Sequence, residues 1–242
     1  MSVLLSSDPI IGVIGGMGPS ATIELMRRIV ERTPAKDDAD HIRILVDNNP
    51  RIPSRIAYLL EGGPIDPAPA LARTAAGLQA AGATHLVMPC NTAHHFAPQI
   101  ESAVTIPFID MIDVSLQACI RRFGPGARIG IVGSPALRAV GVVDRACQDQ
   151  GLEAVYPDAN GQAIALSCIR EVKAGRIGTD VQNAYLSLKR ETLSMRVDGL
   201  LVCCSEFSVL EMHAQPDPEK PIDTLDELTT AVLEVCDLFQ SG

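Results

Sequence analysis

Tryptophan is absent from this sequence, and phenylalanine and tyrosine are scarce. Aromatic residues make up 3% of the 242 residues, and the excess of acidic over basic side chains gives a net charge of −9. Proteins that bind nucleic acid usually present a basic face or an aromatic platform on which bases stack. The composition therefore argues against nucleic acid as a partner.

Long hydrophobic runs are also missing. No stretch approaches the roughly 18 apolar residues that mark a membrane span, and the opening MSVLLSSDP lacks the basic region and the apolar length of a signal peptide. The seven cysteines are an odd number, so we interpret them as free thiols and not as a disulfide framework. These features predict a cytoplasmic protein with no membrane partner.

Short β-branched segments alternate with amphipathic segments, which predicts an α/β protein with mostly parallel sheets. The expected strands cover residues 10–16, 41–49, 84–88 and 106–110, and the expected helices cover residues 21–33 and 68–81. The pattern then begins again near residue 127. The landmarks that recur in the same order and at similar spacing are Gly15, Cys90 and Asp110, followed by Gly133, Cys204 and Asp223. We therefore predict a duplicated α/β unit.

The glycine loop after the first expected strand has two interpretations. Gly16-x-Gly18-x-x-Ala21 loosely matches the dinucleotide-binding fingerprint, which would indicate a dehydrogenase. That fingerprint requires an acid roughly 20 residues further on, and Asp47, the acid that closes the second strand, comes later. In the plainer interpretation the glycines allow a close backbone approach in a cleft, and Pro19 begins a helix.

Two of the cysteines stand apart from the others. Cys90 and Cys204 each follow an apolar strand and precede polar residues that can begin a helix, where free amide groups lower a thiol pKa and can hold an anion. The remaining helical cysteines are assigned to packing, and they are Cys119, Cys147, Cys168 and Cys236. Adjacent pairs such as Cys203-Cys204 and His94-His95 lack a normal chelating spacing, so we expect no metal site.

If the two repeats face each other across a cleft, then Cys90 and Cys204 face each other as well. Two thiols on opposite sides of one carbon suit a reaction in which one face of that carbon loses a proton and the other face gains one. Racemisation is that reaction, and a duplicated acid–base group suits two mirror-image substrates.

Several longer motifs resemble those of the aspartate/glutamate racemase superfamily, and most closely those of its aspartate racemase branch. They are GVIGGMGPSAT (12–22), VDNNPRIPSR (46–55), MPCNTAH (88–94), IPFIDMI (106–112), VKAG (172–175), CSEFSV (204–209) and PIDTLDEL (221–228). The resemblance implies two three-layer α/β domains related by a pseudo-twofold axis, with the active site in the cleft between them. It implies residues 1–105 with 215–242 as the first domain and residues 106–214 as the second. It also implies a homodimer that uses neither pyridoxal phosphate nor a metal.

The resemblance also assigns roles to individual residues. Cys90 and Cys204 match the two catalytic cysteines of the family, and Arg55 and Lys173 match its basic residues for the substrate carboxylate. The other expected substrate-binding residues are Asn91, Thr92, Ser205, Met17 and Asn49. The chain departs from the family at Cys203, where glycine is usual, and at Ser205, where threonine is usual. The first loop lacks the Asp-Ser pair of glutamate racemases, which favours aspartate as the substrate.

The prediction is therefore a cofactor-independent enzyme that interconverts L- and D-aspartate with one thiolate and one thiol. Racemisation of glutamate or of a broader set of amino acids remains an alternative, as does a related isomerase or decarboxylase of the superfamily. A ligand sensor built on the same two-domain fold belongs to a different class, because a fold does not fix a function.

Overall fold

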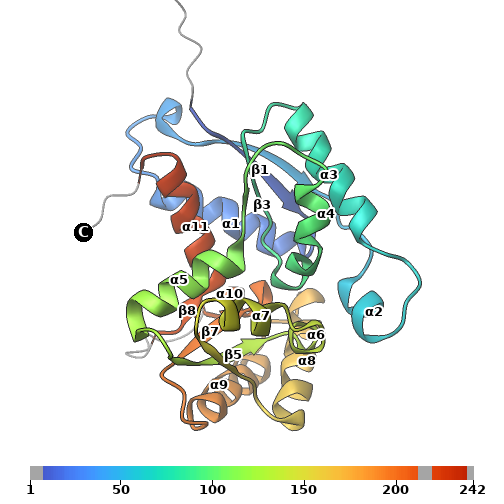
Figure 1. Ribbon diagram of the computed structural model, residues 1–242, viewed down its shortest axis with the longest axis vertical. Helices are drawn as coiled ribbons and strands as arrows, with labels where there is room; N and C mark the ends of the chain where they lie inside the picture. The colour runs from blue at the N-terminus through green and yellow to red at the C-terminus, as the bar shows by residue number, and fades with distance from the viewer. Residues whose placement is uncertain (1–7, 212–219, 239–242) are drawn as a thin grey trace, which may run out of the picture.

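The computed structural model describes residues 8–211 and 220–238, and these residues form two four-stranded parallel sheets (Figure 1). The first sheet has the order β2-β1-β3-β4, and the second has the equivalent order β6-β5-β7-β8. The strands are β1 (Ile10–Gly15), β2 (Arg43–Asn48), β3 (His85–Val87), β4 (Phe108–Ile109), β5 (Arg128–Gly133), β6 (Glu153–Val155), β7 (Gly199–Cys203) and β8 (Ile222–Asp223). The structure confirms the predicted α/β class with parallel sheets.

Helices connect these strands, as expected for parallel pairing. The first unit contains α1 (Pro19–Arg32), the 3₁₀ helix η1 (Asp38–Asp40), α2 (Arg55–Leu60), α3 (Ala68–Ala80), the 3₁₀ helix η2 (Asn91–Phe96), α4 (Ala97–Glu101) and, from the end of the chain, α11 (Thr224–Val235). The second contains α5 (Met111–Phe123), α6 (Pro135–Val140), α7 (Val142–Asp149), α8 (Ala159–Lys173), α9 (Thr179–Leu193) and α10 (Ser205–Glu211). Within the described ranges, every helix is too short or too polar to span a bilayer.

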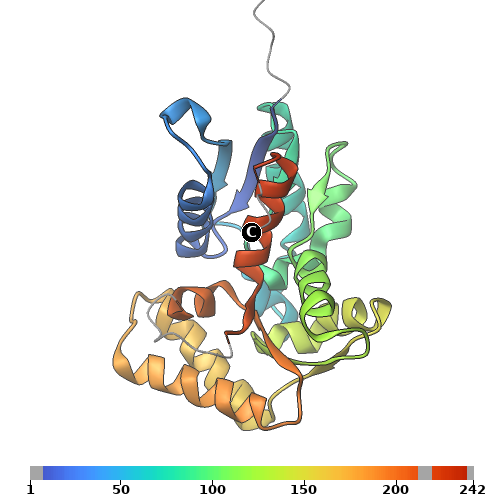
Figure 2. The ribbon, with the colours of Figure 1, turned by 90° about the vertical axis from the view of Figure 1, so that its left-hand side faces the viewer.

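Both faces of the first sheet are covered by helices, which gives three layers (Figure 2). Leu25 of α1 and Val232 of α11 pack against Val13 on one face. Leu71 of α3 and Ile100 of α4 belong to the core on the other face. Burial of these aliphatic side chains is the main favourable contribution to the stability of the unit.

The second sheet has the same layering. Leu116 of α5 packs with Ile131 in the core on one face. Ile169 of α8 and Leu188 of α9 pack with Val202 in the core on the other face. Strands buried on both faces explain why these segments are almost continuously apolar in the sequence.

The chain passes between the two layered units twice. β4 pairs with β3 in the first sheet, but the helix that follows, α5, packs on the second sheet. β8 pairs with β7 in the second sheet, and α11 then packs on the first. The expected boundary after residue 105 is therefore too early, because the apolar segment around Phe108 continues the first sheet up to Asp110. The other expected boundary, between residues 214 and 215, lies outside the described residues.

Equivalent aspartates begin the two crossover helices. Asp110 Oδ1 accepts the backbone N–H of Ile112 at 2.7 Å, and Asp223 Oδ1 accepts that of Leu225, also at 2.7 Å. Such caps satisfy amide groups that a helix start leaves unpaired. They fix where α5 and α11 begin, beside the loops that carry Cys90 and Cys204.

The glycine loop after β1 touches the end of the loop after β2. Gly16 has a φ of +91°, and a Cβ atom there would lie 2.2 Å from the carbonyl carbon of Asn49. Only glycine permits this approach, and Pro19 is the first residue of α1. The geometry agrees with the interpretation that these glycines allow close backbone contact.

Candidate active site

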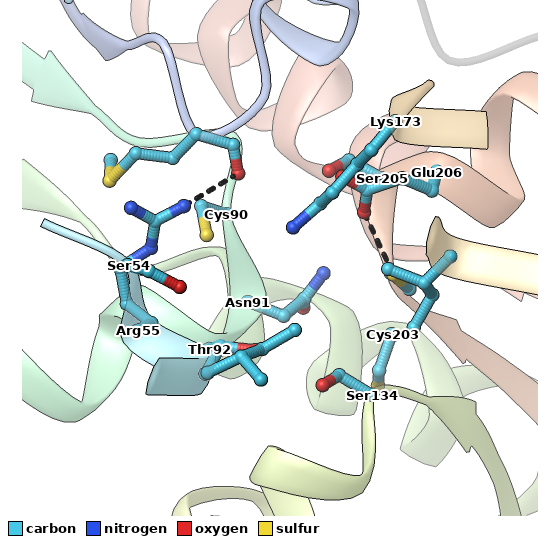
Figure 3. A pocket seen from close by; sticks show the side chains of 14 residues that line it. Ser54, Arg55, Cys90, Asn91, Thr92, Ser134, Lys173, Cys203, Ser205 and Glu206 are labelled. Atoms are coloured by element: carbon cyan, nitrogen blue, oxygen red, sulfur yellow. Dashed lines mark hydrogen bonds and ion pairs between the residues drawn. The ribbon is translucent and has the colours of Figure 1, made fainter. Parts of the chain in front are cut away.

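A narrow cavity of about 30 Å³ lies between the two units, where loops from both sheets converge (Figure 3). Eight of the nine predicted site residues line it, and they are Met17, Arg55, Cys90, Asn91, Thr92, Lys173, Cys204 and Ser205. The other lining residues are Ser54, Ile56, Ser134, Ile169, Cys203 and Glu206. Asn49, the ninth predicted residue, does not line the cavity.

Asn49 has a structural place in the neighbouring loop. Its Oδ1 accepts the backbone N–H of Arg51 at 3.0 Å, and its backbone packs against Gly16. It therefore supports the contact between the loops that carry Met17 and Arg55.

Cys90 lies just beyond β3 and caps the 3₁₀ helix η2. The imidazole of His94 is buried and bridges the carbonyl oxygen of Cys90, at 2.9 Å, and the backbone N–H of Met111, at 3.0 Å. Because an amide N–H can only donate, His94 Nε2 accepts, and Nδ1 carries the proton that is donated to Cys90. This histidine fixes the loop of the first thiol against the start of α5.

Cys204 lies just beyond β7, and its sulfur donates a hydrogen bond to Glu206 Oε2 at 3.0 Å. Burial, together with the charge and the hydrogen bond of Glu206, raises the pKa of the Cys204 thiol well above its ordinary value, and the charge of Lys173 opposes this only in part. The expectation that a helix start lowers the pKa of this thiol is therefore wrong for the structure. A buried carboxylate at the thiol outweighs the amide groups of a seven-residue helix.

Arg55 begins α2 and holds three backbone carbonyl groups. Its Nη1 donates to Pro53 at 2.9 Å and to Ile52 at 3.3 Å, and its Nη2 donates to Met17 at 3.4 Å. Its Nε is buried and has no hydrogen-bond partner among the described residues. The side chain therefore orders the surrounding loops and keeps one N–H group available for an anion.

Lys173 is the last residue of α8 and approaches the cavity from the side opposite Arg55 (Figure 3). Its Nζ lies 3.7 Å from Oε1 of Glu206, and its side chain is 40% exposed. The two cations thus come from different units and face a common space.

The side-chain amide of Asn91 offers the cavity a hydrogen-bond acceptor and no donor. Its Nδ2 donates to Thr224 Oγ1 at 2.9 Å, while its Oδ1 is buried with no partner in the described part of the chain. A buried amide oxygen without a partner is costly, and an ammonium group would satisfy it. The hydroxyl groups of Thr92 and Ser205 lie nearby on opposite units and can donate to a carboxylate.

Comparison with known proteins identifies the family. A sequence profile described as Asp/Glu/Hydantoin racemase matches residues 14–232. The chain belongs to this racemase family.

Solved structures and a curated relative agree with this membership. Aspartate racemase from Picrophilus torridus is 27% identical, with a TM-score of 0.79 over 96% of each chain. Glutamate racemase from Campylobacter jejuni is 16% identical, with a TM-score of 0.64 over 96% of this chain and 88% of that one, and shows the shared fold. A broad specificity amino-acid racemase, RacX, from Bacillus subtilis is 21% identical over 86% of this chain and 89% of that protein.

Glu206 is the main residue of this racemase-family site that the sequence did not single out as functional. It is only 10% exposed in its side chain and contacts both Cys204 and Lys173. Its position two residues after a strand-ending cysteine was a signal that an acid could lie near the thiol. The partner Lys173 is distant in the sequence, so the direction of the carboxylate was not predictable.

The inner pocket continues into an outer cavity of about 350 Å³. Met17, Arg55, Lys173 and Glu206 line both cavities, together with Ser54 and Ser205. The outer walls are formed largely by small and apolar residues, namely Gly16, Gly18, Pro19, Ser20, Ala21, Pro50, Ile52, Val172 and Val209. The family site therefore has room beyond the space between the two thiols.

Proposed function

We propose that this protein interconverts L- and D-aspartate by a cofactor-independent two-base mechanism with Cys90 and Cys204. One observation carries the proposal: these thiols come from equivalent positions of the two repeats and line one cavity between them. Membership of the racemase family supports the reaction class.

In the proposed reaction, the thiolate of one cysteine takes the α-hydrogen as a proton and becomes a thiol. The thiol of the other cysteine then gives its proton to the opposite face of the same carbon and becomes a thiolate. The carbon therefore carries negative charge only between the two transfers. Efficient transfer requires a donor and an acceptor within hydrogen-bond reach of the α-carbon, one on each face.

The substrate's own charged groups match the polar atoms of the cavity. Hydroxyl groups of Thr92 and Ser205 hold the α-carboxylate and stabilise the charge that develops on it. The unpaired Oδ1 of Asn91 accepts from the α-ammonium group. Arg55 Nε and Lys173 Nζ bind the distal carboxylate, since hydrogen bonds between ionised partners are the strong ones.

A broader amino-acid specificity is the second candidate. It is favoured by the outer cavity of about 350 Å³, whose walls are largely apolar and could take up an uncharged side chain. The resemblance to a broad specificity racemase supports the same candidate. The family resemblance also supports a homodimer in the cytoplasm. Each subunit would have two domains, joined where the chain changes units after Asp110 and after Asp223.

A chiral assay across the common amino acids tests the proposal. The purified protein is incubated with single enantiomers, and the two enantiomers are separated and quantified by chiral chromatography. Conversion of aspartate well above that of alanine and leucine supports aspartate specificity, whereas similar rates for neutral side chains support the broader activity. No conversion of any amino acid would remove the racemase proposal and favour a binding module of the same fold.

A further inference from the structure

The two thiols of the site differ in their immediate partners. Cys204 Sγ donates to the carboxylate of Glu206 at 3.0 Å, whereas the sulfur of Cys90 makes no hydrogen bond within the described residues. The sequence explains the difference, because the residue two positions after Cys90 is Thr92, while the residue two positions after Cys204 is Glu206. The duplicated site is therefore chemically asymmetric.

Glu206 is held in place by a second contact. Its Oε1 lies 3.7 Å from Lys173 Nζ, so one carboxylate oxygen faces the ammonium group and the other faces the thiol. The carboxylate can only accept a hydrogen bond, and Cys204 can donate one only while it is protonated. The geometry therefore selects the thiol form of Cys204.

Several charged or titratable groups face the surroundings of Cys204. They are Lys173 from α8, Tyr185 from α9, Glu206 and Glu211 from α10, Asp223 from β8, and Arg55 and Cys90 across the cavity. Tyr185 and Lys189 both donate to Glu211, so that carboxylate is bound elsewhere. Among the described residues, Glu206 makes the side-chain hydrogen bond to the sulfur of Cys204.

We propose that Glu206 keeps Cys204 protonated in the free enzyme, so that Cys90 begins a turnover as the base and Cys204 as the acid. This inference rests on the proposed racemase function and makes Glu206 a positioning residue, because it acts through Cys204. In such a turnover Cys90 takes the α-hydrogen as a proton, and Cys204 gives its own proton to the other face. Before the next identical turnover, Cys90 returns a proton to water and Cys204, beside the Glu206 carboxylate, takes one up.

The pH dependence of thiol labelling tests this arrangement without requiring catalysis. Wild-type protein and Glu206→Gln are pulsed with iodoacetamide at a series of pH values, and labelling of the Cys204 peptide is followed by mass spectrometry. Removal of the carboxylate charge should move the midpoint for Cys204 to lower pH by at least about one unit, equivalent to about tenfold faster labelling below both midpoints. Glu171→Gln, on the exposed side of α8, removes the same charge far from the thiol and should leave the midpoint unchanged.

A second variant gives the opposite sign and guards against a folding defect in Glu206→Gln. Lys173→Met removes the cation that opposes the effect of Glu206, so the Cys204 midpoint should rise. An unchanged Cys204 midpoint in folded Glu206→Gln, or a shift of both variants in the same direction, would overturn the inference.

Racemisation kinetics provide an independent reading. In Glu206→Gln the alkaline limb of kcat/KM should move to lower pH, because the acid loses its proton earlier. A carboxylate with only a structural role would lower the whole profile without moving that limb. If wild-type protein racemises nothing, the proposed function fails, while the labelling experiment still decides whether Glu206 controls Cys204.

Discussion

His94 and Cys90 are joined by a hydrogen bond of 2.9 Å from the imidazole Nδ1 to the backbone carbonyl oxygen. The second repeat has a counterpart, since Ser208 Oγ donates to Asp223 at 2.8 Å and to the carbonyl oxygen of Cys204 at 3.4 Å. In both repeats the residue four positions after the cysteine that lines the cavity ties the cysteine loop to the start of the next crossover helix. The position of each thiol is thus coupled to the point where the chain changes units.

Substitution of His94 should therefore affect both stability and catalysis. His94→Ala removes two buried hydrogen bonds and leaves a cavity, so we expect a loss of roughly 2–4 kcal/mol in the free energy of unfolding. Chemical denaturation measures this loss, and kcat for racemisation should fall because the Cys90 loop is no longer fixed. His41→Ala, at an exposed histidine, should change stability by less than about 0.5 kcal/mol. Equal effects of the two substitutions would contradict the role of His94.

The two thiols proposed as catalytic should be individually essential. Cys90→Ser and Cys204→Ser should each lower racemisation by at least about a hundredfold, the lower end of what an acid or base contributes. Each variant should retain exchange of the α-hydrogen from one enantiomer only, because one base survives, and NMR in deuterated water measures this exchange.

Cys203 provides the matched control for these thiols. Cys203 ends β7 and is 1% exposed; it borders the cavity but packs in the core of the second unit, so Cys203→Ala should keep most of the activity. Loss of activity in Cys203→Ala with retention in Cys204→Ser would place the second catalytic thiol one residue earlier.

Recognition of the distal carboxylate should depend on Lys173. Lys173→Met should weaken kcat/KM for aspartate by about 10- to 150-fold, which corresponds to the roughly 1.5–3 kcal/mol of a hydrogen bond to a charged group. Alanine, which has no distal charge, should be affected much less. Equal losses for aspartate and alanine in Lys173→Met would exclude the assigned contact.

Arg55→Leu should reduce aspartate turnover as well, but it also removes the contacts that order the loops. Arg51→Leu, at an exposed site, is the control.

A buried arginine joins α1 to the returning chain. Arg28 contacts Glu24 at 2.6 Å, Asp226 at 2.8 Å and the carbonyl oxygen of Ser208 at 3.2 Å. Arg28 Nη1 also lies 3.5 Å from the buried carboxylate of Asp223, which Arg28→Met would leave without this cation, whereas Glu24 keeps its bonds to Arg27. The substitution should therefore cost roughly 3–5 kcal/mol of unfolding free energy at pH 7. Arg43→Met, at an exposed residue of β2, is the control and should have little effect.

The cost of Arg28→Met should shrink in acid. Burial alone would raise the pKa of Glu24, but hydrogen bonds from Arg27 and Arg28 outweigh it and leave the pKa lowered. A carboxyl group whose pKa is lowered in the native state stabilises the fold at pH values above its ordinary pKa of 4.5. That contribution is lost as the pH falls through the native pKa. The difference in unfolding free energy between wild type and Arg28→Met should therefore be smaller at pH 4 than at pH 7. The same difference at both pH values would contradict the ion-pair account.

The sequence predicted the parts of the fold that local patterns control. Alternating apolar segments identified both sheets, and the repeated landmarks at Cys90 and Cys204 placed the two thiols in equivalent positions. The expected boundary after residue 105 falls in the loop before β4, whereas the chain changes units only after that strand, at Asp110. A strand of two residues carries no local pattern that shows which sheet it joins.

The sequence could not predict contacts that depend on the distant chain. The direction of the Glu206 carboxylate is set by Lys173 on another helix, and the amide orientation of Asn91 is set by Thr224. Asn49 follows a strand end like several residues that line the cavity, yet its side chain binds the backbone N–H of Arg51 and does not line the cavity. Such orientations come from tertiary packing and not from local spacing.

The central claim is that two opposed thiols exchange a proton on aspartate. The most direct test incubates pure L-aspartate and, separately, pure D-aspartate with the protein in deuterated water, and follows chirality and α-deuterium together. The account predicts that both samples reach the same equal mixture and that each newly formed enantiomer carries deuterium at the α-carbon. Retention of optical purity in both samples, or inversion without uptake of deuterium, would contradict it.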